Sequence, residues 1–334
     1  MKRIKLGIIG TGLAARDLHL EPLQELADQF EIVALCNRTR AKAEAFRDLI
    51  GGGPRITTDY RELLSWPEVE AVDVALPIVL NEPVTIDALR AGKHIILEKP
   101  IGHDLEAGRH VVAEADLHPD LVLLVAENER YEERVRAAGT LVSEGRIGRP
   151  MLVQAEVLAP RNPNSPYAAT TWRIEPEHIG GYLSDGGVHE AAKIQVVAGP
   201  VSAVQGIITA FGPEKDPTDT LLANLRFQSG AAGHLTYSVG VLERDEPSLR
   251  VHGTEGSLAV HRHRIVVTDA DGNEEVLEFS DAPNPYTLEF LDFYRAVAEG
   301  KPPDVTPRQA LSDLAVIAAS FQSSEEGRTV PIEA

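Results

Sequence analysis

Short apolar runs alternate with segments of helical periodicity in the first part of the chain, and this alternation constrains the fold most. The runs are rich in Val, Ile and Leu without regular polar alternation, which is typical of strands covered on both faces of a parallel sheet. They are Ile4–Gly10, Ile32–Cys36, Ala71–Leu76, His94–Leu97 and Leu121–Ala126. The amphipathic segments are Leu13–Gln29, Arg40–Ile50, Tyr60–Ser65, Asn81–Ala91 and Leu105–Leu117. Repeated strand–helix–strand units predict an α/β fold with a doubly wound parallel sheet, the Rossmann fold.

The pattern changes after about residue 150, where most segments resemble strands joined by short turns. The expected strands are Met151–Pro160, Val201–Phe211, Thr220–Phe227, Ala231–Val241, Leu249–Gly253, Ser257–His261, Ile265–Asp269 and Glu274–Phe279. Asp271-Gly272 predicts a tight turn between two of them. Helical patterns lie near Gly187–Ala198, Thr287–Glu299 and Pro307–Ser323. We therefore predict a doubly wound α/β domain over 1–126 and an α+β domain built on a mainly antiparallel sheet over 127–334, entered through a helix at Tyr131–Glu144.

Length and charge narrow the class of function. The chain has 334 residues, enough for two domains at ~150 residues each. Its 32 basic and 51 acidic residues give a net charge of 32 − 51 = −19, which disfavours nucleic-acid and membrane-surface partners. No run approaches the ~18 apolar residues of a membrane span. The single cysteine, Cys36, excludes an intramolecular disulfide framework, so we expect a soluble, cytoplasmic protein.

A glycine-rich turn directly follows the first expected strand. Gly10-Thr11-Gly12-Leu13-Ala14-Ala15 fits G-x-G-x-x-A, in which the first glycine permits a tight turn and the second lets a pyrophosphate approach the backbone. The small Ala15 lets the helix pack closely, and the phosphate would lie at the helix N-terminus. A purely structural turn is the alternative. The surrounding strand–helix–strand pattern favours dinucleotide binding by Gly10, Thr11, Gly12, Leu13 and Ala14.

The end of the second expected strand bears on the choice of cofactor. Asn37-Arg38-Thr39 stands where NAD-binding folds carry an acid that bonds the 2′-hydroxyl of the ribose. An acid there would repel a 2′-phosphate, whereas Arg38 and Thr39 can receive one. The sequence therefore favours NADP. If Arg38 instead stacks on adenine or is solvated, NAD remains acceptable.

A charged pair ends another expected strand. Glu98-Lys99-Pro100 follows His94–Leu97 directly, and ligands of doubly wound sheets bind beyond the carboxyl ends of strands. Pro100 restricts the backbone, and a cis Lys99–Pro100 bond would help to orient the lysine. These residues are expected to face the nicotinamide. The alternative is an ordinary surface salt pair.

A second polar group lies far downstream, in the glycine-rich segment Gly180–Glu190. Asp185 and His189 are four residues apart, so in a helix both project from one face. A histidine can accept a proton near neutral pH, and a nearby carboxylate can orient it or the substrate. The glycines are expected to leave room for a ligand. The alternative makes Asp185 a helix N-cap and His189 an interior histidine with satisfied hydrogen bonds.

Taken together, the G-x-G-x-x-A turn, Glu98-Lys99-Pro100 and Gly-Gly…Asp185-x-x-x-His189 resemble the Gfo/Idh/MocA family, which includes glucose–fructose oxidoreductase and inositol 2-dehydrogenase. The resemblance covers essentially the whole chain and implies a Rossmann domain followed by an α+β domain with a large, mostly antiparallel open sheet. It implies NAD(P)-dependent oxidation or reduction at a carbinol carbon of a sugar, polyol or cyclitol. It also implies homodimers or homotetramers that pair through the sheet of the second domain.

The resemblance further implies roles for three residues. Lys99, Asp185 and His189 match the catalytic triad of the family by position. His189 would take the hydroxyl proton as the hydride leaves, and Lys99 would stabilise the developing alkoxide and depress the pKa of His189. Asp185 would hold a substrate hydroxyl and help to place the base.

Further positions are carried over with less support from the residues themselves. Trp172 and Arg173 resemble a segment that approaches substrate in relatives, and Tyr286 is a weaker substrate candidate. Other positions are expected near the cofactor. Glu98 would meet the nicotinamide ribose, Asn128 follows another strand end, and Pro77 would shape a loop over the cofactor.

The chain departs from the family pattern in one loop. Many relatives have Asn-Arg-Arg or Asn-Arg-Tyr after the last strand of the first domain, where this chain reads Glu127-Asn128-Glu129-Arg130-Tyr131. The additional acid, Glu129, puts in doubt a carry-over of substrate contacts from that loop.

Two other readings of function remain open. A retained cofactor can support a redox-neutral epimerase, lyase or glycosidase reaction, and a sugar-sensing regulatory protein can keep the pocket without turnover. A sensor has no need of a base, so the presence of Lys99, Asp185 and His189 favours the enzyme. The histidines show no metal-ligand spacing, and no metal is expected.

Overall fold

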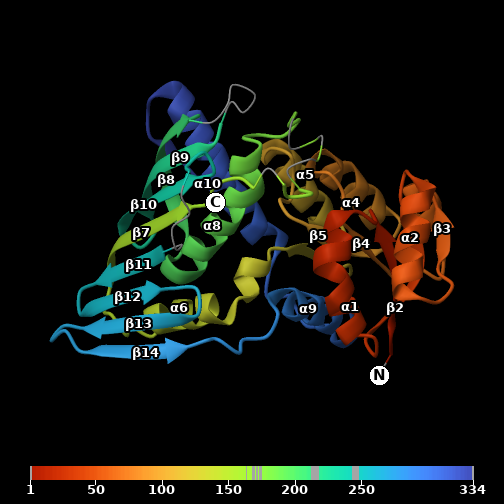
Figure 1. Cartoon of the computed structure of the whole chain (residues 1–334), viewed down its shortest axis with the longest axis horizontal. Helices are drawn as coiled ribbons and strands as arrows, with labels where there is room; N and C mark the ends of the chain where they lie inside the picture. Colours follow the sequence, from red (N-terminus) through yellow and green to blue (C-terminus); the bar gives the residue numbers. More distant parts are fainter. Residues whose placement is uncertain are drawn as a thin grey trace. The chain divides into compact units, whose positions relative to one another are not determined.

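The computed structural model describes residues 2–162, 164–167, 170, 172, 175–211, 218–242 and 248–332. The described chain divides into two units (Figure 1). The first contains Met1–Asn128 and Pro283–Leu311, and the second contains Glu129–Ala282 and Ser312–Ala334. The predicted domain limits at residues 126 and 127 stay a prediction. Within the described ranges, no helix combines the length and the apolar character needed to cross a membrane.

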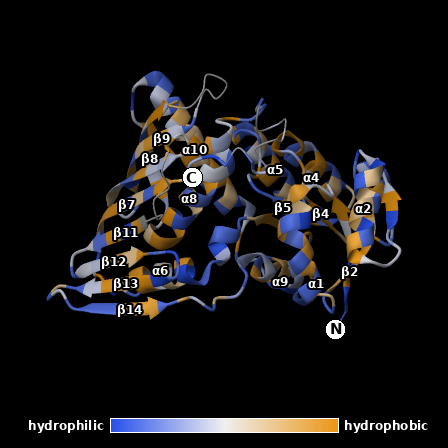
Figure 2. Ribbon diagram, viewed as in Figure 1, coloured by the Kyte–Doolittle hydropathy of each residue, from blue (hydrophilic) through white to orange (hydrophobic). Residues whose placement is uncertain are grey.

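The described part of the first unit contains a six-stranded parallel sheet in the order β3-β2-β1-β4-β5-β6. Its strands are β1 (Ile4–Ile9), β2 (Phe30–Cys36), β3 (Arg55–Thr57), β4 (Ala71–Val74), β5 (His94–Glu98) and β6 (Leu123–Ala126). All residues of β4 and β6 are buried, as expected for strands covered on both faces. Figure 2 shows the hydrophobic colour along much of β4 and β5. The predicted Rossmann sheet is confirmed.

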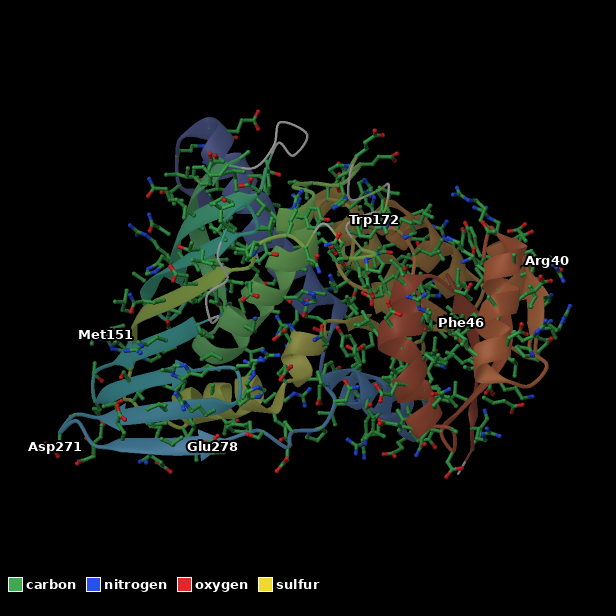
Figure 3. All side chains as sticks on the ribbon, in the orientation of Figure 1. Arg40, Phe46, Met151, Trp172, Asp271 and Glu278 are labelled. Carbon is green, nitrogen blue, oxygen red and sulfur yellow. The ribbon has the colours of Figure 1, made fainter. Side chains whose placement is uncertain are left out.

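Helical segments connect these strands. They are η1 (Ala15–His19), α1 (Leu20–Glu25), α2 (Arg40–Ile50), α3 (Tyr60–Leu64), η2 (Ile78–Leu80), α4 (Asn81–Arg90) and α5 (Leu105–Asp116). The longer helices bury one face: in α2, Phe46 is buried while Arg40 stays exposed (Figure 3). The Asp104 side chain caps α5 by accepting from the Ala107 N–H.

Helix α9 (Pro285–Glu299) belongs to the first unit although it follows most of the second in sequence. The Phe30 ring lies 6.0 Å from that of Phe290 and 6.4 Å from that of Phe293, both of which are completely buried. The Tyr294 ring lies 5.9 Å from the Phe30 ring. This aromatic cluster gives α9 its apolar contact with the start of the parallel sheet.

The described part of the second unit contains a nine-stranded sheet in the order β14-β13-β12-β11-β7-β10-β9-β8-β15. Only the β7–β10 pair is parallel among its described pairings, so the predicted mostly antiparallel sheet is confirmed. The strands are β7 (Pro150–Leu158), β8 (Val201–Thr209), β9 (Thr220–Phe227), β10 (Ala232–Ser238), β11 (Ser248–Gly253), β12 (Gly256–Val260), β13 (Arg264–Asp269), β14 (Glu274–Glu278) and β15 (Val330–Pro331). The expected turn at Asp271-Gly272 joins β13 to β14, with Asp271 at its tip in Figure 3.

The described helices of this unit are α6 (Glu133–Ser143), α8 (Tyr182–Ala198) and α10 (Pro307–Glu326), and the first residues of α10 belong to the first unit. A buried ion pair joins Arg130, in the 3₁₀ turn η3 (Asn128–Tyr131), to Asp313 of α10 at 2.6 Å. The Gln195 amide of α8 donates to the same carboxylate at 2.7 Å. Arg130, α8 and α10 therefore share one buried hydrogen-bond network.

Two differences from the sequence prediction concern local structure. Strand β3 is only three residues long, and its sequence contains no apolar run that would predict a strand. The expected helix Leu13–Gln29 contains the π-helical turn η1, from which α1 continues only to Glu25. Such turns place an additional residue in one helical turn and change which side chains face inward.

Candidate active site

The glycine turn after β1 has the geometry that its sequence predicts. Gly10 has φ +101°, and a Cβ there would lie 2.1 Å from the Ala75 carbonyl oxygen, so only glycine fits. At Gly12 a Cβ would meet nothing within 4 Å. Ala15 is completely buried, as close packing of the helix on the sheet requires.

This turn fits a dinucleotide. The open space at Gly12 lies where a pyrophosphate must approach the backbone. The buried hydroxyl of Thr11 finds no hydrogen-bond partner among the described residues, and a phosphate oxygen would satisfy it. Leu13 and Ala14 begin the helix whose N-terminus faces the same turn.

All residues predicted to contact the cofactor lie in the first unit, after the carboxyl ends of its parallel strands. They are Gly10, Thr11, Gly12, Leu13 and Ala14 after β1; Asn37, Arg38 and Thr39 after β2; Pro77 after β4; Glu98 and Lys99 at the end of β5; and Asn128 after β6. Since the strands are parallel, these ends lie along one edge of the sheet. The topology thus brings together residues separated by more than a hundred positions.

The segment after β2 leaves cationic and hydroxyl groups at the surface. Arg38 and Thr39 are exposed, and the Asn37 side chain accepts from the Thr39 N–H at 3.0 Å. Thr39 precedes α2 but makes no side-chain cap. Burial raises the pKa of the nearby Cys36 thiol to about 12, so this cysteine stays a thiol at neutral pH.

The residues around Lys99 are held from the buried side. The Asn81 amide donates to the carbonyl oxygens of Glu98 and Pro100, at 2.9 and 2.7 Å. The Lys99–Pro100 bond is cis, and Lys99 itself is half-buried. The Glu98 carboxylate is buried and lies 3.1 Å from Nε2 of His19. The alternative of an exposed salt pair is therefore wrong, because Glu98 is not at the surface.

Asp185 and His189 both lie on α8, one helical turn apart and on one face. The helix begins at Tyr182, and its N-cap is Gly181, which makes no side-chain cap. Asp185 thus lies within the first turn, and its alternative role as N-cap is wrong. Asp185 is buried and His189 is half-buried.

The glycines around this helix do not serve the purpose that the sequence suggested. A Cβ would meet the Phe321 ring at 2.4 Å from Gly180, the Tyr237 hydroxyl at 2.0 Å from Gly186, and Ile317 at 3.0 Å from Gly187. The expectation that these glycines leave room for a ligand is therefore wrong at all three positions. The unit's own side chains fill the space, because α8 packs closely on β10 and α10.

The remaining predicted substrate residues belong to different units of the chain. Trp172, labelled in Figure 3, is half-buried, and its ring lies 5.6 Å from that of His178. The His178 Nε2 lies 3.1 Å from the Gly181 carbonyl oxygen at the start of α8. Arg173 lies outside the described residues. Tyr286 is half-buried on α9 of the first unit, where its N–H donates to the Asn284 side chain.

Two residues of the loop that departs from the family pattern make structural contacts within their own unit. Arg130 forms the buried pair with Asp313 described above. Glu129 lies 3.7 Å from the Lys193 ammonium and 3.9 Å from the Arg134 guanidinium. The additional acid thus faces two cations of its own unit.

Sequence reasoning missed a cluster of buried ionisable groups behind the sheet edge. His19 and Glu289 are completely buried in the first unit. Burial alone would lower the pKa of His19, but Asp73 and Glu98 raise it well above its ordinary value. Burial, with Glu98, Glu127 and Asp73, raises the pKa of Glu289 against the opposing effect of His19. One signal was available: Asp73 interrupts an apolar strand, and a buried acid needs a partner.

The raised pKa of Glu289 predicts a pH-dependent gain in stability for Glu289→Gln. A carboxyl with a raised folded pKa stabilises fully below its unfolded pKa, and this contribution is lost as pH rises towards the folded pKa. Wild type should therefore lose stability in that window by up to about 1.4 kcal/mol per pH unit, and the variant should not. Thermal melts at pH 4 and pH 8 measure this.

Glu299→Gln is the matched control, since Glu299 lies on the same helix but is exposed and pairs with Lys301. It should give no stabilisation at pH 8. If Glu289→Gln melts no higher than wild type at pH 8, Glu289 is not held protonated.

Comparison with known proteins places this geometry in context. A family model described as "Oxidoreductase family, NAD-binding Rossmann fold" matches residues 4–126, and one described as "Oxidoreductase family, C-terminal alpha/beta domain" matches residues 140–332. An uncharacterized protein of Saccharomyces cerevisiae is 32% identical over 352 residues, covering 100% of this chain and 99% of its own length. The 1,5-anhydro-D-fructose reductase of Ensifer adhaerens is 28% identical, covering 98% of each. The crystal structure of an oxidoreductase from Thermotoga maritima has a TM-score of 0.92 at 38% identity and covers 99% of each chain.

Proposed function

The chain belongs to the Gfo/Idh/MocA oxidoreductase family and is an NAD(P)-dependent oxidoreductase, and from this premise we propose that it transfers a hydride at a carbinol carbon of a sugar, polyol or cyclitol. The observation that carries the proposal is the carboxyl edge of the parallel sheet. There the glycine turn after β1 fits a dinucleotide, and Lys99 follows the last residue of β5. The sugar reductase among the relatives supports the substrate class.

In the proposed mechanism, three side chains act on the substrate. When bound, the nicotinamide supplies or accepts the hydride. His189 accepts the hydroxyl proton during oxidation and returns it during reduction. Lys99 donates a hydrogen bond to the reacting oxygen and stabilises alkoxide charge, which would also depress the pKa of His189. Asp185, one turn before His189 on α8, holds a substrate hydroxyl.

We further propose that NADP is preferred over NAD. Arg38 and Thr39 are exposed after β2, and residues 37–39 include no acid. A guanidinium at this position attracts a 2′-phosphate, which an acid would repel.

A screen of sugars, polyols and cyclitols with NADP and with NAD tests these proposals, with the absorbance of the reduced nicotinamide as readout. Net turnover on at least one such compound is expected, at lower KM for NADP. A clear NAD preference would contradict the choice of cofactor. Substrate conversion by tightly retained cofactor without net reduction would favour the redox-neutral alternative, and sugar binding without turnover would favour the sensor.

A homodimer or homotetramer formed through the large sheet of the second unit is also proposed. On the side of this sheet where Leu222 and Ile207 pair across β9 and β8, they are 40% and 59% exposed. Burying such apolar side chains against a second copy would be favourable. Light scattering should give a multiple of the 36.2 kDa chain mass, and Ile207→Asp should shift it towards the monomer. A monomer at all concentrations would contradict this. Separately, we propose that the protein is located in the cytoplasm.

A further inference from the structure

A buried imidazole bridges two carboxylates directly behind the end of β5. His19 Nδ1 lies 2.9 and 3.1 Å from the two carboxylate oxygens of Asp73, and its Nε2 lies 3.1 Å from Oε1 of Glu98. His19 and Asp73 are completely buried, and Glu98 is 8% exposed. An ionised carboxylate only accepts hydrogen bonds. Between two ionised carboxylates, both ring nitrogens of His19 would donate, and the ring would be an imidazolium.

The bridge joins three elements of the first unit. His19 ends the π-helical turn η1, Asp73 lies in the middle of β4, and Glu98 is the last residue of β5. The Phe290 ring of α9 meets the imidazole edge-on at 5.2 Å and helps to exclude water. Further ionisable groups of this cluster include Glu127, after β6, and Glu289, on α9. Carboxyl groups of β4 and β5 thus bond the imidazole directly, and that of Glu289 on α9 interacts with it electrostatically.

Glu98 is held at two points as a result. Its side chain is bound through His19 to β4, and its carbonyl oxygen accepts from the Asn81 amide, which also bonds the carbonyl of Pro100. Hydrogen bonds from buried side chains therefore hold Glu98 and Pro100, the two residues that flank Lys99. A displacement of Glu98 moves the backbone from which Lys99 projects.

Stability alone does not account for this bridge. Burying an imidazolium with two carboxylates costs desolvation energy, and apolar replacements of buried ionic groups are often neutral or stabilising. On this general ground, an apolar trio is expected to hold η1, β4 and β5 together about as well. The charged bridge differs from an apolar trio because its hydrogen bonds fix the orientation of the Glu98 carboxylate.

We propose that His19 is a positioning residue, which acts through its bridge between Asp73 and Glu98 to hold Lys99 in the orientation needed for hydride transfer. The inference rests on the proposed role of Lys99. It adds residues of β4 and η1 that do not themselves touch the reacting atoms.

The protonation of His19 can be tested without any substrate. In the full chain labelled with ¹⁵N-histidine, one imidazole should keep both nitrogens protonated at pH 8, and its signals should disappear in His19→Gln. A neutral ring at position 19 at pH 8 would overturn the proposal.

Kinetics test the positioning role. His19→Gln should lower kcat by about 10- to 100-fold, the cost typical of small misplacements, with the Kd for NADPH changed less than about threefold. His94→Gln is the matched control, because His94 begins β5 whereas Glu98 ends it. It should leave kcat unchanged.

A double-variant cycle separates positioning from general structural damage. If His19 acts through Lys99, His19→Gln should cost little more in a Lys99→Met background, measured in single turnovers with excess enzyme. The same fold loss in both backgrounds would overturn the positioning role while leaving the role of Lys99 intact. Full turnover in Lys99→Met alone would instead contradict the proposed role of Lys99, on which this inference rests. If His19→Gln does not fold, Asp73→Asn carries the same cycle with the same expected outcomes.

Discussion

Lys99→Met should lower kcat by about 10²- to 10³-fold while the Kd for the cofactor stays within a few fold of wild type. The reason is that a preorganised donor stabilises the alkoxide in the transition state far more than the neutral hydroxyl of the ground state. Met keeps the length and apolar stem of the side chain but cannot donate. Steady-state kinetics on the best substrate, with cofactor binding measured separately, give the two quantities.

Lys301→Met is the matched control, since Lys301 is an exposed lysine that pairs with the nearby Glu299. It should retain wild-type kcat. Unchanged turnover in Lys99→Met would remove Lys99 from the mechanism, and an equal loss in cofactor affinity would make it a binding residue.

His189→Ala should reduce turnover by about 10²- to 10⁴-fold and should also change the pH dependence of the reaction. A neutral imidazole accepts the proton of the substrate hydroxyl, so the rate of oxidation should rise with pH as the ring loses its proton. Without the imidazole, that rise should vanish from the profile of kcat/KM. The measurement is oxidation over the pH range in which the enzyme stays folded.

His263→Ala controls for the loss of a histidine from the same unit, because His263 lies in the exposed turn between β12 and β13. It should keep both the rate and the shape of the profile. If the alkaline rise persists in His189→Ala, another group is the base. Asp185 would then need to be tested first, as the ionisable residue one turn earlier on α8.

Local pattern was sufficient for much of the candidate site. The apolar run Ile4–Gly10 and the glycines after it predicted a turn whose φ and close approach to Ala75 only Gly10 can meet. The four-residue spacing of Asp185 and His189 predicted one helical face, and α8 provides it. These inferences succeeded because backbone conformation and periodicity depend mainly on neighbouring residues.

Other features depend on packing between distant segments. The sequence predicts that Gly186 leaves space for a ligand, but the Tyr237 hydroxyl of β10 lies against it. Likewise, α9 follows the second sheet in sequence, but Phe290 and Phe293 pack with Phe30 of the first unit. No periodicity within either segment contains that information.

By itself, then, the sequence determined the two kinds of sheet, the dinucleotide turn and the helix that carries Asp185 and His189. Only the tertiary structure decided that His19, Asp73 and Glu98 share one buried bridge and that Glu289 lies beside it. The physical reason is that periodicity records which face of an element is buried, whereas the partner of a buried charge is chosen by the packing of elements far apart in the chain.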